Sequence, residues 1–168
     1  QAADLMADPN LAKVGIFMGF GGMIAVFIGL LNIARGMATA GGSGSSYANI
    51  STILIMATIP AMAIAAGLEF GTTEATSAAS GASLMGISVA VGSSMQIVMG
   101  IALTLLAVGI VLDKNLHLIG AAVLAIAGVA LLVSARPFVD AEPLLYVGWI
   151  SLMVSGLLLG GLTLKSNT

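Results

Sequence analysis

The chain is divided into long apolar segments that carry almost no charge. Residues 116–133, for example, contain no Asp, Glu, Lys or Arg. Across all 168 residues, hydrophobic residues make up 59% and charged residues only 7%, whereas soluble domains carry about a quarter charged residues. Five Lys or Arg and seven Asp or Glu are too few to cover a soluble surface. Most side chains must therefore face lipid or other protein.

Continuous apolar segments of this length are typical of transmembrane helices. The bilayer core offers no water to backbone N–H and C=O groups, so only helices and closed barrels span it. Barrel strands alternate apolar and polar residues over about ten positions, whereas the segments here are continuously apolar. We therefore predict an all-α, multi-pass integral membrane protein of the cytoplasmic (cell) membrane, with residues 1–168 forming a single transmembrane helical domain.

Turn and cap residues divide the apolar sequence into six predicted spans. Asp8 and Pro9 suit the start of the first helix, and Gly36 suits its left-handed end. Asn49 suits the start of the second helix, in which Pro60 predicts a kink. The predicted spans cover approximately residues 11–34, 50–68, 75–91, 94–112, 116–135 and 144–164.

One stretch, residues 84–112, leaves the number of helices open. As a single helix it is about 43 Å long, against about 30 Å of hydrocarbon core, and needs a steep tilt. Two shorter helices would instead meet at a turn over residues 92–94. The single helix gives a five-helix bundle that places Arg35, Lys114 and Lys165 on one side, with six of the seven acids opposite. The two shorter helices give six spans and a less distinct separation of charge.

Few residues offer catalytic or metal-binding chemistry. The sequence has no cysteine and one histidine, His117, so thiolate ligands and two-histidine sites within the chain are excluded. Ten methionines suit Cu(I), and Met95 and Met99 lie one turn apart, but methionine is also a common packing residue. No cluster of Lys or Arg predicts nucleic-acid binding. We expect no enzyme activity, no metal site and no cofactor.

Several polar residues interrupt the apolar segments. Glu69 ends the second predicted helix, where it is either an intramembrane carboxylate or a solvated interfacial one. Thr58 and Gln96 lie inside apolar segments, where such groups line pores or hydrogen-bond neighbouring helices. Small residues one turn apart, such as Gly15 and Gly19, permit close contact between helices. We therefore expect contact with other copies of the chain or with other membrane subunits.

Four short segments occur in a recognisable order. They are Asp8-Pro9-Asn10 with Met18-Gly19-Phe20-Gly21, then Ala66-Gly67-Leu68-Glu69-Phe70, then residues 78–83 (AASGAS), then Gly148-Trp149-Ile150. Together they resemble segments of the acetate uptake transporter family, the succinate–acetate permeases. The resemblance implies a hexamer of six-helix bundles, each with a pore for acetate and similar small carboxylates. It implies that Phe20 lies at the constriction and that Ser80, Ser83 and Gln96 are polar pore groups.

The sequence leaves two functions open. The first is a channel or transporter for acetate or a similar small monocarboxylate, which predicts that the candidate residues converge on one path within the chain. The second is a non-catalytic subunit of a larger membrane complex, of the respiratory or monooxygenase type. It is favoured because Ala79 and Ser80 stand where the transporter family has an aromatic residue. The candidate site residues are Phe20, Thr58, Glu69, Ser80, Ser83 and Gln96.

Overall fold

The computed structural model describes residues 1–114, 118–135 and 142–166, with side chains described up to residue 160 except that of Glu142. These ranges contain helices and no strand, which confirms the predicted all-α class. Four of the helices are long and apolar enough to cross a membrane, and α5 is a shorter apolar helix. The helices are α1 (Ala2–Ala7), α2 (Pro9–Ala40), α3 (Ser45–Thr73), α4 (Ala78–Asp113), α5 (Leu118–Ser134) and α6 (Glu142–Ser166).

The turn predicted over residues 92–94 is absent, because this region is the middle of one helix. α4 has 36 residues and is therefore about 54 Å long. Ser93 and Ser94 do not open a turn, since their hydroxyls donate to carbonyl oxygens one turn back at 2.9 and 3.2 Å. The separate spans predicted over 75–91 and 94–112 are thus corrected to a single helix. Six helices remain in the described chain because the short α1, which was not predicted, precedes the first span.

Capping residues set the ends of α2. Asp8 caps its start as predicted, because the carboxylate accepts a hydrogen bond from the N–H of Leu11 at 3.2 Å and Pro9 takes the first position. The end lies at Gly41 and not at Gly36. Gly41 has a φ of 73°, a left-handed conformation that glycine adopts without a steric penalty. The first span therefore extends one full turn beyond the predicted cap.

The second span begins earlier and ends later than predicted. α3 starts at Ser45, before the expected cap Asn49, and continues through Pro60 to Thr73. Its start is fixed against the end of α4, because a side chain at Gly44 would collide with the carbonyl of Gly109. The polar stretch between the second and third spans is reduced to residues 74–77.

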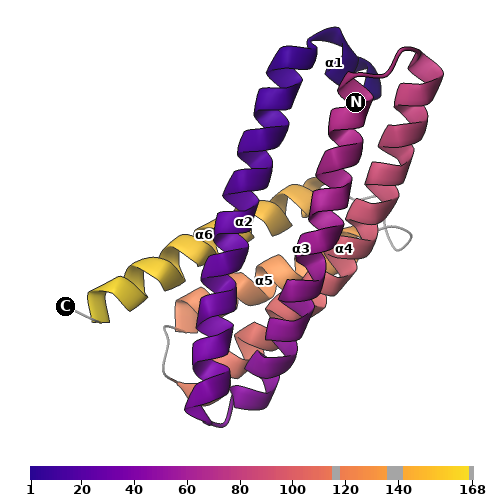
Figure 1. The fold of residues 1–168 in the computed structure, drawn as a ribbon. Coiled ribbons are helices and arrows are strands. Elements are labelled where there is room, and N and C mark those ends of the chain that lie inside the picture. The colour runs from indigo at the N-terminus through magenta and orange to yellow at the C-terminus, as the bar shows by residue number, and fades with distance from the viewer. Residues whose placement is uncertain (115–117, 136–141, 167–168) are drawn as a thin grey trace.

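The helices form two groups that cross one another (Figure 1). α2, α3 and α4 run alongside each other, with α3 in contact with both of its neighbours. α5 and α6 run obliquely across these three helices, α5 in contact with α4, and α6 in contact with α5 and α2. The short α1 folds against α2, α3 and α4 at the end where α2 begins. The core therefore lies at the crossing, and the first half of α2 lies beyond it.

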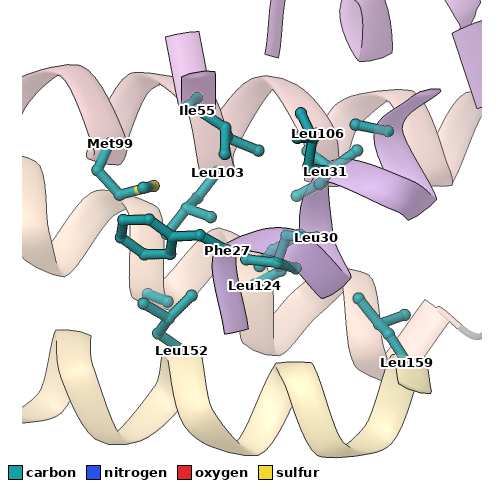
Figure 2. Packing of buried hydrophobic residues seen from close by; sticks show 14 of the residues in the cluster. Phe27, Leu30, Leu31, Ile55, Met99, Leu103, Leu106, Leu124, Leu152 and Leu159 are labelled. Carbon is teal, nitrogen blue, oxygen red and sulfur yellow. The ribbon is translucent and has the colours of Figure 1, made fainter. Parts of the chain in front are cut away.

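Buried apolar side chains join α2, α3, α4, α5 and α6 at the crossing (Figure 2). Phe27 of α2 is fully buried and lies among Met99 and Leu103 of α4, Leu124 of α5 and Leu152 of α6. Each of these side chains has 0% exposure. Phe27 therefore helps to anchor α2 to the oblique pair.

Outside the crossing, large apolar side chains are exposed on every long helix. Phe17 and Met18 of α2 are 71% and 70% exposed, and Leu157 of α6 is 77% exposed. A soluble protein does not leave apolar surface of this extent in water. The chain is therefore a multi-pass α-helical membrane protein, as the sequence predicts, and these faces contact lipid or other membrane helices.

Candidate functional site

A cavity of about 830 Å³ lies between the first half of α2, the second half of α3 and the first half of α4. It extends toward the end of the bundle at which α1 packs, and α2, α3 and α4 form most of its lining. Its lining includes Gly15, Gly19, Phe20 and Met23 of α2, Met62, Ala65, Ala66 and Glu69 of α3, and Met85, Ser88, Gly92, Ser93, Met95 and Gln96 of α4, with Ser134, Leu145 and Trp149 contributed by α5 and α6.

Small residues create this space. A side chain added at Gly15, Gly19 or Gly92 would meet nothing within 4 Å. The spacing of Gly15 and Gly19 predicted close contact between helices. Within this chain these two glycines make no such contact. On α4, Ser88, Gly92 and Gln96 are four residues apart and so share one helical face. The sequence thus places two polar side chains and a glycine on the side of α4 that faces the cavity.

Glu69 is the charged side chain of the cavity lining. It is partly buried and lies four residues, or about 6 Å along the axis, before the end of α3 at Thr73. The Ser88 hydroxyl lies between the helices, 3.1 Å from the carbonyl of Ala65 and 3.4 Å from Glu69 Oε1. The ion pairs within the described residues involve Asp4 and Glu74, and neither includes Glu69.

Aromatic and thioether groups line the same cavity as the carboxylate. Phe20 enters the lining from α2 and Trp149 from α6. Thioethers are contributed by all three enclosing helices, Met62 and Met95 among them, and both are only 7% exposed. The cavity therefore combines one acid, a few hydroxyl and amide groups, and polarizable apolar walls.

The cavity ends at the buried core. One turn beyond the lining residues Met23 and Met95 lie Phe27 and Met99, both with 0% exposure. Ile55 closes the corresponding face of α3 and is also fully buried. These three side chains pack in one cluster (Figure 2). A solute in the cavity therefore faces a closed apolar barrier on the side of the α2–α3 turn.

Three of the six predicted site residues meet in this cavity, namely Phe20, Glu69 and Gln96. Thr58 is buried elsewhere, and its hydroxyl donates to the carbonyl of Ile55 in its own helix at 2.7 Å. Ser80 and Ser83 are exposed and lie outside the cavity lining. The prediction that Thr58 and Ser80 join the same path is therefore corrected.

Ser80 has a local structural role. Its N–H donates to the Ser77 hydroxyl at 3.2 Å, an arrangement that caps the start of α4. Its own hydroxyl donates to the Ser77 carbonyl at 2.9 Å. The first of these bonds satisfies one of the free N–H groups of the first turn, which explains the serines at this point without a pore.

Ser88 and Trp149 line the cavity although the sequence did not single them out as site residues. Ser88 had a readable signal, since it lies four residues before Gly92 and eight before Gln96 on the same face. Trp149 had none, because an aromatic residue near the start of the last span is typical of the membrane interface. Its place in the cavity depends on the oblique path of α6.

An ion pair joins α2 to the turn after α3 near the open end of the cavity. Lys13 Nζ lies 2.7 Å from Glu74 Oε1. The hydrogen bond from Lys13, together with its positive charge, lowers the pKa of Glu74 below its ordinary value. Both side chains are accessible to solvent, so the pair aligns the two helix ends without contributing much to stability.

Metal ligands do not gather in the described part of the chain. No group of three His, Cys, Asp or Glu side chains is close enough to bind a metal ion there. His117 lies outside the described residues. The Met95–Met99 pair, which suits Cu(I) by spacing, belongs to the buried core cluster, and Met95 also borders the cavity. Packing therefore accounts for Met99.

A second cavity, of about 930 Å³, lies between α2 and α6. Its walls are apolar or small, except for Asn32 and Asp113. Asp113 Oδ1 accepts a hydrogen bond from the N–H of Gly44 at 3.0 Å, and the neighbouring Ser43 hydroxyl donates to the carbonyl of Leu112 at 2.7 Å. Asp113 thus fastens the α2–α3 turn to the end of α4.

Comparison with known proteins leaves the function to be argued from this geometry. No family model, no curated protein and no solved structure matches the chain. The class of protein is nevertheless defined by the fold, which consists of apolar helices of membrane-spanning length around one buried core. The Glu69 cavity is a feature of this multi-pass membrane protein that packing alone does not require.

Proposed function

We propose that this protein is a channel or transporter for a small solute, and that the solute occupies the cavity lined by Glu69, Ser88 and Gln96. The observation that carries the proposal is a partly buried carboxylate facing an 830 Å³ cavity between apolar helices. Ionisable groups at such positions are costly and commonly mark solute or ion pathways. A purely structural subunit has no need of the cavity or of the acid.

The closed barrier at Phe27, Ile55 and Met99 favours a transporter over an open pore. The cavity reaches α1 at one end and stops at the buried core at the other. Access from one side at a time is the arrangement expected for alternating access. In this proposal, α2 moves relative to α3 and α4 to open the other side.

We propose an orientation from the described charges. Arg35 and Lys114 lie at the end of the bundle with the α2–α3 turn, whereas Lys13 lies at the α1 end with Asp4 and Asp8. The positive-inside rule then favours a cytoplasmic α2–α3 turn in a cell membrane. The cavity consequently opens to the outside, as uptake requires.

From the resemblance to succinate–acetate permeases, we propose acetate as a solute. Phe20 and Glu69 belong to the segments that carry this resemblance, and both line the cavity. The described lining has no Lys, Arg or His side chain to pair with an anion. Acetate would therefore enter this cavity as the neutral acid, with its hydroxyl donating to Glu69. The hexameric assembly of that family is part of the same proposal.

Flux measurement in liposomes tests the proposal. We expect the purified protein to carry at least one of acetate, methylammonium and glycerol faster than protein-free liposomes do. Gln96→Leu should reduce this flux by about tenfold or more, because it replaces a polar group of the path with an apolar one of similar size.

Ser94→Ala is the matched control for the flux measurement. Ser94 lies two residues from Gln96 on α4, is exposed outside the cavity, and donates only to its own helix. Its replacement should leave flux unchanged. The proposal is contradicted if none of the three solutes crosses, or if Gln96→Leu and Ser94→Ala have equal effects.

A non-catalytic subunit of a larger membrane complex is the second candidate. The observation that favours it is the exposed apolar face of α2, which includes Leu11, Val14, Phe17 and Met18. This face has no partner within the described chain. Purification from native membranes in mild detergent distinguishes the two candidates, because stoichiometric recovery with unlike chains supports a subunit, whereas a homo-oligomer supports a transporter.

A further inference from the structure

The Glu69 carboxylate lacks a positively charged partner within the described residues. Its one side-chain hydrogen bond comes from the Ser88 hydroxyl at 3.4 Å, and that hydroxyl lies closer to the carbonyl of Ala65, at 3.1 Å. Lys13 is paired with Glu74, and the amino group of Gln1, which also borders the cavity, is paired with Asp4 at 3.0 Å. Glu69 is thus the charged side chain of the described lining, and it has no ion-pair partner among the described residues.

An unbalanced carboxylate in a membrane helix attracts a cation. Removal of a carboxylate from water is costly unless an opposite charge or several hydrogen bonds replace the lost solvation. Among the described residues, one long hydrogen bond from a side chain replaces the solvation that Glu69 has lost. A positively charged solute that enters the cavity gains an attraction that a neutral solute lacks, and an anion is repelled.

The size and walls of the cavity favour an organic cation over a metal ion. A volume of about 830 Å³ lies within the range of cavities that hold drug-sized molecules. Phe20 and Trp149 provide aromatic faces, which attract ammonium groups. Thioethers such as those of Met62 and Met95 adapt to apolar ligands of different shape. A metal ion needs several close ligands, and no such cluster of His, Cys, Asp or Glu exists in the described chain.

We propose that the Glu69 cavity binds small organic cations, such as substituted ammonium or phosphonium ions, with Glu69 as the counter-ion and Phe20 and Trp149 as aromatic walls. This inference rests on the proposed function, since it names the solute class of the same cavity. It replaces acetate as the preferred solute.

Tetraphenylphosphonium binding to the purified protein in detergent tests the inference. Trp149 is the single tryptophan of the chain and lines the cavity, so its fluorescence reports occupancy directly. We expect a saturable change with tetraphenylphosphonium and none with tetraphenylborate, an anion of nearly the same shape. Glu69→Gln should weaken binding by about tenfold or more, and Glu69→Asp should retain most of it.

Glu74→Gln is the control, because it removes an acid near the cavity mouth that does not line it. It should leave binding unchanged. Equal responses to the phosphonium and borate ions would overturn the inference, and this comparison needs only the wild-type protein if Glu69→Gln fails to fold. A Glu69→Gln variant that folds and binds with wild-type affinity would also overturn it. Binding in detergent is independent of flux, so a cation site without transport and transport without a cation site give different results.

Discussion

Replacement of Phe27 by alanine is expected to lower the free energy of unfolding by about 3 kcal/mol. Phe27 is fully buried where α2 meets α4, α5 and α6 (Figure 2). In a bilayer the loss is not one of hydrophobic transfer, because lipid is as apolar as the core. The cost comes from the dispersion contacts that an empty space cannot supply. Unfolding by a denaturing detergent in mixed micelles measures the change.

Phe17→Ala is the matched control for this substitution. Phe17 lies on the same helix, has the same side chain and is 71% exposed. Its replacement should change the free energy of unfolding by less than about 0.5 kcal/mol. A similar loss of stability in both variants would show that α2 is not anchored to the other helices through Phe27.

Replacement of Gly100 by leucine is expected to separate α4 from α5 and to cost about 3 kcal/mol or more. An added Cβ at Gly100 would lie 2.7 Å from the carbonyl oxygen of Gly128 and 2.9 Å from the backbone N of Leu132. Gly128 is equally tight, since its added Cβ would lie 2.8 Å from the carbonyl oxygen of Gly100. Backbone atoms cannot move aside as a flexible side chain can, so the helices must part. Size-exclusion chromatography and detergent-induced unfolding report the loss.

Gly86→Leu provides the comparison on the same helix. A side chain added at Gly86 would meet nothing within 4 Å, and the residue is exposed. This variant should fold normally and gain slightly from the better helix propensity of leucine. If Gly100→Leu behaved like Gly86→Leu, the close contact between α4 and α5 would be contradicted.

The fold class was predictable because the bilayer restricts a chain of this composition to helices. The length of α4 was not. Gly92-Ser93-Ser94 has the composition of a turn, yet the two serine hydroxyls are satisfied by the carbonyls of their own helix. Composition alone does not decide between turn and helix at this point, because serine hydroxyls can be hydrogen-bonded in either.

The residues of the candidate site could be predicted only in part. Glu69 and Gln96 stand out because charged and amide groups are rare in apolar segments, and both line the cavity. Thr58 and Ser80 looked equally eligible, but each has a hydroxyl bonded to a nearby carbonyl of its own segment. The sequence does not distinguish a Ser or Thr whose hydroxyl is hydrogen-bonded within its own segment from one whose hydroxyl faces a cavity. Trp149 could not be predicted as a cavity residue, because its position depends on how α6 crosses the other helices, and only the tertiary structure shows this.

We expect α4 to span the membrane with one face on the Glu69 cavity, accessible to water, and the other on apolar surroundings. The chain has no native cysteine, so single substitutions Ser93→Cys and Ile87→Cys can be compared directly in membranes. Ser93 lines the cavity, whereas Ile87 is 50% exposed on the outer surface of the chain. A water-soluble thiosulfonate reacts with thiolate, which forms in a hydrated cavity and not in an apolar environment. We predict rapid labelling of the Ser93→Cys variant and almost none of the Ile87→Cys variant, and equal labelling of the two would contradict the claim.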